Sequence, residues 1–385
     1  MKINDVKNVC VVGAGNMGHQ IALQCALSGF KTVSTDVVPA VLEKAQKFVE
    51  GYLPGRVQKG KMTEEAAKKA RSLISFTGDI KEAAKDADIV IEAVLERIDL
   101  KRKVFADLDK YAPPAAILAT NSSFIVSSRI ADATKRPSQI CNLHFFNPAL
   151  VMKLVEVVQG PHVSDETAQC MMDFCLKIDK IPIHIKKEVD GFVLNRIFAV
   201  IQREALWMLE MGVASFEDID KACVYGAGHP MGPFRLNDLT GIDLTYDICM
   251  SHFLESGNPA DLPSPSVVKR FTEGKYGQKT GEGWYSYKKQ TAAYAQVRIK
   301  KDVLKLKNFG ASSFFTPLSQ LRNTGRDEAG KDQALPARIA DLMFFTGRHK
   351  QNRPGFDRAP LAVAVGFTNA GMDEDFMFPG MRVFR

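Results

Sequence analysis

Residues 9–18, Val-Cys-Val-Val-Gly-Ala-Gly-Asn-Met-Gly, decide the fold of this chain. The β-branched run at 9–12 predicts a buried strand, and the apolar residues after position 20 recur at helical spacing. Between them, Gly13 allows a tight turn, Gly15 lets the backbone approach a pyrophosphate, and Gly18 allows close packing of helix on strand. A strand, this glycine pattern and a helix in that order predict a dinucleotide-binding loop formed by Gly13, Ala14, Gly15, Asn16, Met17 and Gly18.

An acidic residue follows at the distance that NAD recognition needs. Asp36 stands directly after the second predicted strand, residues 31–35, and 18 residues beyond Gly18. A carboxylate at this place accepts hydrogen bonds from the adenosine ribose and repels a 2′-phosphate. Val37 and Val38 follow it and offer no positive charge to bind such a phosphate. The sequence therefore predicts NAD, not NADP, as the cofactor.

Strand and helix patterns alternate through the first half of the chain, which predicts a doubly wound, mostly parallel sheet. Strands are predicted at residues 9–12, 31–35, 89–94, 116–120, 140–145, 152–158 and 181–185. Helices are predicted at 100–111, 129–133 and 165–177, and two Lys-rich helices, broken near Gly55 and Gly60, fill residues 41–85. From residue 192 only helical patterns continue, at 192–211, 216–225, 236–254 and 266–273. We expect an α/β Rossmann-type NAD-binding domain at 1–186 and an all-helical substrate and dimerisation domain at 187–288.

The charge distribution separates a third region from these two. The chain has 385 residues and a net charge of +7. Residues 289–385 hold 16 basic and 9 acidic residues, so the first 288 residues carry 35 of each. The apolar residues of this basic extension show weak periodicity, which leaves its structure open, disorder included. Its arginines form no compact cluster, so we expect no nucleic-acid or membrane partner.

Composition excludes several other classes of protein. The 45 % hydrophobic content is ample for packed cores, and no apolar run reaches the length of a membrane span. Residues 1–8 have no signal-peptide hydrophobic stretch, so we expect no secretion signal. The seven cysteines form no C-x-x-C pair and no cluster at zinc spacing, so no metal site is expected. The default location is the cytoplasm.

Several long motifs in one order carry a specific resemblance. They are Asn121-Ser122-Ser123, residues 143–148 (Leu-His-Phe-Phe-Asn-Pro), residues 152–157 (Met-Lys-Leu-Val-Glu-Val), residues 190–196 (Asp-Gly-Phe-Val-Leu-Asn-Arg), residues 226–233 and residues 277–283. From about residue 7 to residue 287 the chain resembles the L-3-hydroxyacyl-CoA dehydrogenase family, especially its 3-hydroxybutyryl-CoA dehydrogenases. The resemblance implies reversible NAD-dependent oxidation of an (S)-3-hydroxyacyl-CoA to the 3-oxoacyl-CoA, with short chains favoured, by a homodimer joined through the helical domain.

The chemistry of this oxidation needs a base for the hydroxyl proton, and the ordinary pKa of histidine suits that task. His144 is the candidate base, and the family pattern implies that Glu156 orients its imidazole. By the same resemblance, Ser123 and Asn195 bind the C3 oxygen of the substrate, and Asn147 helps to place the nicotinamide.

Charged residues complete the predicted site. Glu96, Lys101 and Lys279 stand at family positions that contact NAD. A basic stretch at residues 56–71 could meet the phosphates of coenzyme A, and Lys59 matches the family's CoA-contacting lysine best. Each of these residues could equally belong to a solvated face.

Departures from the family pattern leave alternatives open. Asp190 stands where the family usually has proline, Ala149-Leu150 replaces Val-Pro, and Phe124 replaces a small polar residue. These changes leave His144 and Glu156 intact but put the acyl preference in doubt. A dehydrogenase of a branched, aromatic or carnitine-type 3-hydroxy substrate is one alternative, and a non-catalytic NAD-binding protein on the same scaffold is another.

Overall fold

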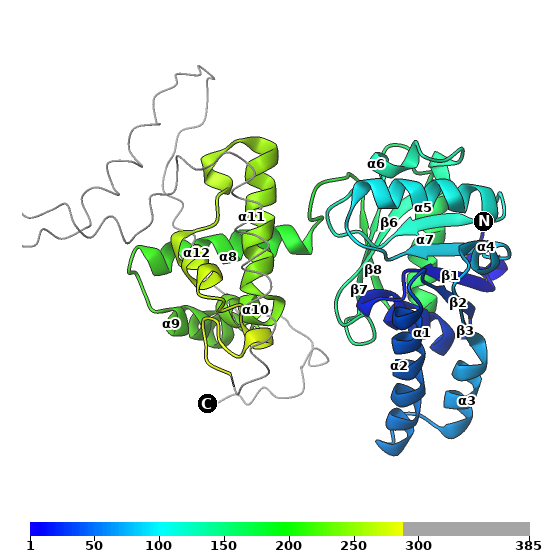
Figure 1. Ribbon diagram of the computed structural model, residues 1–385, viewed down its shortest axis with the longest axis horizontal. Coiled ribbons are helices and arrows are strands. Elements are labelled where there is room, and N and C mark those ends of the chain that lie inside the picture. The colour runs from blue at the N-terminus through cyan, green and yellow to red at the C-terminus, as the bar shows by residue number, and fades with distance from the viewer. Residues whose placement is uncertain (288–385) are drawn as a thin grey trace, which may run out of the picture. The chain divides into compact units, whose positions relative to one another are not determined.

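The computed structural model describes residues 1–287, and its N-terminal part is an eight-stranded sheet with helices on both faces (Figure 1). The strands are β1 (Asn8–Val12), β2 (Lys31–Thr35), β3 (Ile74–Thr77), β4 (Ile89–Glu92), β5 (Ile117–Thr120), β6 (Ile140–Phe145), β7 (Leu154–Val158) and β8 (Ile181–Ile185). Their order is β3-β2-β1-β4-β5-β6-β7-β8, and all neighbours are parallel except β6 and β7. The order reverses between β1 and β4, which is the switch point where doubly wound sheets bind dinucleotides. The predicted Rossmann-type fold is confirmed.

Side chains of the strands point alternately to the two faces of the sheet and pack into a separate core on each face. Val9 and Val11 of β1 join one core, which is covered by α1 (Asn16–Leu27), α2 (Pro39–Gln58), α3 (Glu64–Leu73) and α7 (Asp165–Lys177). Cys10 and Val12 point the other way, into a core covered by α4 (Ile80–Ala84), α5 (Ile98–Tyr111) and α6 (Ser128–Ala131). Because both faces of the parallel strands are buried, these strands read as continuous apolar runs.

Two predictions between residues 41 and 85 are wrong. Strand β3 was not predicted, because only Ile74 of its four residues is fully buried and the strand lies at the sheet edge, where no apolar run is needed. Helix α2 was expected to break near Gly55, yet it continues to Gln58. Its buried residues Val49 and Leu53 anchor it to the sheet core, and such tertiary packing overrides the low helix propensity of Pro54 and Gly55.

The remaining described residues form helices α8 (Leu194–Glu210), α9 (Phe216–Lys221), α10 (Pro233–Thr240), α11 (Ile242–Ser256) and α12 (Pro265–Thr272) around a small core of their own. The single helix expected at 236–254 is two helices, since Gly241, at φ 110°, separates α10 from α11. Asp238 of α10 accepts hydrogen bonds from the backbone of Trp284 and Tyr285, which fixes the segment before residue 287. The predicted basic extension, residues 289–385, lies outside the described residues.

Residues 1–287 contain neither a membrane-spanning helix nor a metal-binding cluster. None of the helices within 1–287 is long and apolar enough to cross a membrane. No group of three or more His, Cys, Asp or Glu side chains in that same range is arranged to hold a metal ion.

Candidate active site

His144 and Glu156 face each other across the only antiparallel pairing among the described strands. In the register of β6 and β7 the two residues are direct partners, and the carboxylate oxygen Oε2 of Glu156 lies 2.7 Å from Nδ1 of His144. His144 is 3 % exposed and Glu156 is fully buried. Because a carboxylate only accepts hydrogen bonds, Nδ1 carries the imidazole proton and Nε2 is left as an acceptor. The geometry therefore presents Nε2 as a base.

Ser123 lies at this second nitrogen. It follows β5, the neighbour of β6 in the sheet, and its Oγ is 3.0 Å from Nε2 of His144. Asn121 holds the same loop against β6, because its Oδ1 accepts a hydrogen bond of 2.9 Å from the backbone N–H of Phe145. Ser123, His144 and Glu156 thus form one continuous hydrogen-bonded chain.

Two aromatic rings that were not predicted as site residues flank the imidazole. The ring centroid of Phe146 lies 4.6 Å from that of His144, and the centroid of Phe192 lies 5.5 Å from it. Phe192 is buried and has φ of 50°, a left-handed conformation that a bulky residue rarely adopts. Such strain is retained where the surroundings enforce it, commonly at functional sites. Both residues belong to motifs that carried the family resemblance, and membership of those motifs was the signal in the sequence that could have identified them.

The second oxygen of Glu156 fixes the start of helix α8. Its Oε1 accepts the backbone N–H groups of Val193 at 3.1 Å and Leu194 at 3.0 Å. Asn195 is the next residue, and a Cβ added at Gly191 would lie 3.6 Å from Cβ of Asn195 and 3.7 Å from the ring of Phe124. The carboxylate that orients His144 therefore also fixes the backbone beside Asn195.

The glycine loop fits a dinucleotide. A Cβ at Gly13 would lie 2.7 Å from the carbonyl oxygen of Ala93, and one at Gly18 would lie 1.7 Å from that of Gly13, so neither position admits a side chain. A Cβ at Gly15 would meet nothing within 4 Å, which is the open approach a pyrophosphate needs. Gly15 precedes α1, whose first turn has no side-chain cap among the described residues, so its amides face this opening.

Asp36 stands at the end of β2, against the same loop. Its Oδ2 accepts the backbone N–H of Ala14 at 2.9 Å, and its Oδ1 accepts that of Val38 at 2.9 Å. These bonds aim the carboxylate and leave lone pairs for ribose hydroxyls.

Asn147 is hydrogen-bonded to the glycine loop, and a buried lysine holds the segment that follows it. Nδ2 of Asn16 donates to Oδ1 of Asn147 at 3.0 Å. The segment after Asn147 is fixed by the buried Lys180, whose Nζ donates to the carbonyls of Ala149 at 2.6 Å and Met152 at 2.9 Å. Burial lowers the pKa of Lys180, and the charge of nearby Lys153 lowers it further. Sequence reasoning missed Lys180, because an isolated lysine before a strand gives no signal of burial.

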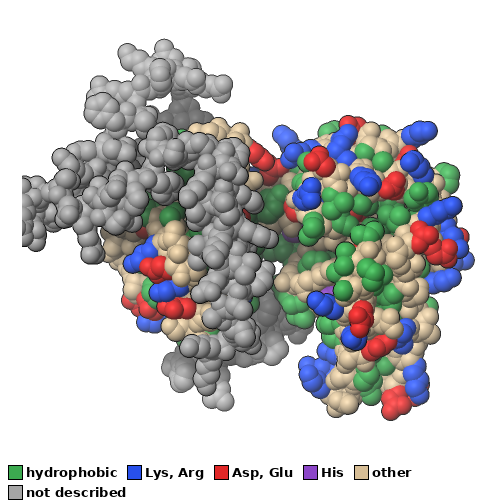
Figure 2. Space-filling model, viewed as in Figure 1, with side chains coloured by type: hydrophobic (Ala, Val, Ile, Leu, Met, Phe, Trp, Pro, Cys, Tyr) green, Lys and Arg blue, Asp and Glu red, His purple; other side chains and the backbone are tan. Residues whose placement is uncertain are grey.

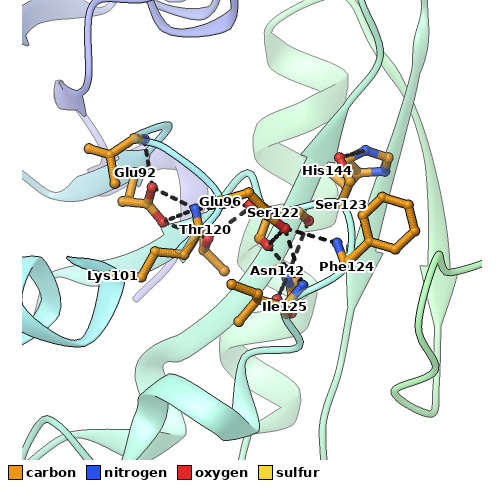
Figure 3. Close-up of polar contacts among 11 residues, drawn as sticks. Glu92, Glu96, Lys101, Thr120, Ser122, Ser123, Phe124, Ile125, Asn142 and His144 are labelled. Atoms are coloured by element: carbon orange, nitrogen blue, oxygen red, sulfur yellow. Dashed lines mark hydrogen bonds and ion pairs between the residues drawn. The ribbon is translucent and has the colours of Figure 1, made fainter. Parts of the chain in front are cut away.

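Glu96 and Lys101 lie together beside the Ser123 loop (Figure 3). Nζ of Lys101 is 3.3 Å from Oε2 of Glu96, whose other oxygen accepts bonds from the hydroxyl of Ser122 and from the backbone N–H groups of Phe124 and Ile125. Burial alone would raise the pKa of Glu96, but the charge of Lys101 and these hydrogen bonds outweigh it and hold the pKa below its ordinary value.

The remaining predicted residues lie elsewhere. Lys59 caps the C-terminus of α2, exposed at the tip of the α2–α3 hairpin, where Figure 2 shows side chains of both charge signs. Lys279 forms an ion pair with Asp243 inside the helical region. Their expected contacts with CoA and NAD stay predictions.

Comparisons with known proteins agree with this geometry. Residues 8–189 match the family "3-hydroxyacyl-CoA dehydrogenase, NAD binding domain", and residues 191–287 match "3-hydroxyacyl-CoA dehydrogenase, C-terminal domain". The chain belongs to the 3-hydroxyacyl-CoA dehydrogenase family. As a member of that family it is an NAD-dependent oxidoreductase, and the predicted resemblance is confirmed.

Individual relatives span most of the described residues. The mitochondrial hydroxyacyl-coenzyme A dehydrogenase of Homo sapiens is 40 % identical over 290 residues, which is 74 % of this chain and 92 % of the relative. A probable 3-hydroxybutyryl-CoA dehydrogenase of Bacillus subtilis is 37 % identical over 288 residues, 75 % of this chain and 100 % of the relative. The crystal structure of (S)-3-hydroxybutyryl-CoA dehydrogenase from Ralstonia eutropha has a TM-score of 0.69 at 34 % identity, covering 74 % of this chain and all of that one.

Proposed function

We propose that this dehydrogenase oxidises short-chain (S)-3-hydroxyacyl-CoA thioesters, 3-hydroxybutyryl-CoA first among them, and that His144 is the base. The observation that carries the proposal is the buried chain from Glu156 through His144 to Ser123, with bonds of 2.7 and 3.0 Å. Relatives named 3-hydroxybutyryl-CoA dehydrogenase support the short-chain preference.

The residues divide the work of the reaction among them. Nε2 of His144 accepts the proton of the substrate hydroxyl, and the buried carboxylate of Glu156 stabilises the imidazolium that forms. Ser123 and Asn195 hydrogen-bond the C3 oxygen and so hold the hydroxyl at Nε2. When bound, NAD supplies the hydride acceptor. In the reverse direction the imidazolium of His144 returns the proton to the oxygen.

Cofactor and thioester are held by separate groups of residues. The loop 13–18 and Asp36 would bind the adenosine and pyrophosphate of NAD, and Glu96, Lys101, Asn147 and Lys279 would contribute further contacts. Lys59 would meet the phosphates of CoA as a point charge. We place the division between the two catalytic domains at residues 186 and 187, and the cell compartment in the cytoplasm.

We also propose a homodimer formed through the helical domain. Helix α8 exposes Ile197, Val200 and Trp207, each by about half of its surface, at 49 %, 56 % and 52 %. Apolar side chains gathered on one helix favour a protein partner over water. Analytical ultracentrifugation tests this, and a chain that sediments as a monomer would contradict it.

The decisive assay follows NADH formation with (S)-3-hydroxybutyryl-CoA. His144→Ala should lower kcat by about 10²–10⁴-fold, because it removes the general base. His184→Ala is the matched control, since His184 is exposed on β8, away from the hydrogen-bonded chain. Turnover in His144→Ala equal to that of the wild type would refute the mechanism.

A substrate panel tests the acyl preference. The 3-hydroxybutyryl, 3-hydroxydecanoyl and 3-hydroxypalmitoyl thioesters are compared with branched, aromatic and carnitine-type 3-hydroxy compounds by kcat/KM. The proposal expects the butyryl thioester to lead. A lead by any other compound would contradict the short-chain assignment and leave the role of His144 untouched.

A further inference from the structure

The carboxylate of Glu92 is a buried, fully paired group outside the residues already assigned. It ends β4, is fully buried, and accepts from three donors. Oε1 accepts the backbone N–H of Val94 at 2.6 Å, both oxygens accept Nζ of Lys101 at 2.8 and 3.0 Å, and Oε2 accepts the hydroxyl of Thr120 at 2.7 Å (Figure 3). A buried charge is costly unless it is paired and hydrogen-bonded, so this arrangement depends on all three partners.

Two branches lead from Glu92 to the loop that carries Ser123. In the first, Glu92 holds the ammonium of Lys101, which is 1 % exposed and also pairs with Glu96 at 3.3 Å. Glu96 in turn accepts three donors from the loop residues 122–125, as described above. The ammonium of Lys101 therefore links the carboxylates of Glu92 and Glu96.

The second branch is shorter. The hydroxyl of Thr120 donates to Glu92, and its oxygen accepts the backbone N–H of Ser122 at 3.2 Å. One branch therefore holds the backbone before Ser123, and the other holds the side chain of Ser122 and the backbone after Ser123. Ser123 lies between them with its Oγ 3.0 Å from Nε2 of His144.

We propose that Glu92 is a positioning residue for the dehydrogenase reaction, which acts through Lys101 and Thr120 to hold Ser123 at Nε2 of His144. The inference rests on the role proposed for Ser123. A buried ion pair is weak evidence for stability, because apolar replacement is often neutral, whereas a catalytic hydroxyl misplaced by about 1 Å can cost about 100-fold in rate. The function of this network is thus to fix the geometry of one loop.

The test compares two carboxylates at opposite ends of β4. Glu92→Gln keeps the volume but places an amide N–H₂ where Lys101 or Thr120 donates. Asp88→Asn is the matched control: Asp88 precedes β4 at its opposite end, where it accepts the backbone N–H groups of Lys7 and Asn8 at 2.8 and 2.9 Å. Glu92→Gln should lower kcat by about 10–100-fold, with the KM for 3-hydroxybutyryl-CoA changed by less than about threefold, whereas Asp88→Asn should leave both constants near the wild type.

A second pair of variants isolates one hydroxyl. Thr120→Val removes both hydrogen bonds of the Thr120 side chain at constant volume, and Thr120→Ser restores them. Thr120→Val should lower kcat by about tenfold, and Thr120→Ser should recover it, with KM unchanged in both. A merely structural role would lower the melting temperature and the folded fraction without separating kcat from KM. If Glu92→Gln does not fold, this pair decides the question alone.

Ser123→Ala, measured alongside, separates the two possible failures. If Ser123→Ala loses activity while Glu92→Gln and Thr120→Val keep the wild-type kcat, the positioning role of Glu92 is overturned and the proposed mechanism stands. If Ser123→Ala itself keeps the wild-type kcat, the role assigned to Ser123 fails first and the positioning role falls with it. Equal losses in Glu92→Gln and Asp88→Asn would also overturn the inference.

Discussion

Glu156→Gln should separate catalysis from folding at the centre of the site. The carboxylate of Glu156 serves three donors: Nδ1 of His144 on one oxygen and the amides of Val193 and Leu194 on the other. Glutamine has the same volume, and its carbonyl oxygen can keep the two amides of α8. Its N–H₂ group then faces Nδ1, which must become an acceptor, and the imidazole proton moves to Nε2.

The size of the effect follows from this change of tautomer. With a proton on Nε2, His144 cannot accept one from the substrate hydroxyl. The corresponding change in a serine-protease triad keeps the geometry and lowers kcat by about 10⁴-fold. We expect a fall of about 10³–10⁴-fold here, which corresponds to about 4–5.5 kcal/mol of transition-state stabilisation. Because the amides of Val193 and Leu194 keep their acceptor, the melting temperature should change by only a few degrees.

The assay is NADH formation with 3-hydroxybutyryl-CoA, with thermal unfolding measured on the same preparation. Glu188→Gln is the control: this carboxylate precedes α8 and accepts the hydroxyl of Ser127 at 2.8 Å and the N–H of Ser128 at 2.9 Å, without contact to the imidazole. It should keep kcat within about threefold. A kcat for Glu156→Gln within tenfold of the wild type would refute the tautomer argument, whether or not stability falls.

Three further perturbations follow from contacts in the structure. Lys180→Met should lower the free energy of unfolding, measured with urea, by about 1–3 kcal/mol for each carbonyl that loses its hydrogen bond. Lys153→Met breaks an exposed ion pair and should lower it by less than about 1 kcal/mol, so equal losses would contradict a buried role for Lys180. The pKa of Glu96 lies below its ordinary value of 4.5, so its contribution to stability is present above that pH and is lost as the pH falls through the lowered pKa. Glu96→Gln should therefore reduce the acid-side slope of the free energy of unfolding against pH, and an unchanged slope would refute this. Asp36→Ala should lower the ratio of kcat/KM with NAD to kcat/KM with NADP by at least about tenfold, because it removes a ribose acceptor and the repulsion of a 2′-phosphate. An unaltered ratio would show that Asp36 does not select the cofactor.

The glycine loop and Asp36 could be located from the sequence because the constraints on them are local. The glycine loop and Asp36 are dictated by a single turn and by the end of the next strand, so spacing along the chain determines their position. The pairing of His144 with Glu156 is different, because it depends on β6 and β7 running antiparallel in a register that places the two residues opposite each other. A separation of 12 positions along the chain does not specify that register, and only the resemblance to a family connected the two residues.

The elements that sequence reasoning missed had no pattern of their own. Strand β3 lies at the sheet edge with little burial, so it required no apolar run. The break at Gly241 interrupts an otherwise continuous helical pattern, and its φ of 110° is a property of tertiary packing: a Cβ there would lie 2.6 Å from Oδ1 of Asp243. Phe192, whose ring lies beside that of His144, has a left-handed backbone conformation that local propensity would not select.

A buried acid within an apolar strand was a signal that the sequence did offer. Glu92 follows Ile-Val-Ile in β4, and Glu156 interrupts Leu-Val-Val-Val in β7. An ionised carboxylate in such a strand either breaks the burial of the strand or requires partners that are built for it. Both strands are fully buried around these residues, and both carboxylates have three donors each. Places where a local rule fails without harm to the fold are expected at functional sites. The same criterion that marks Glu156 as the partner of the base therefore marks Glu92 as a residue of the site, although no motif points to it.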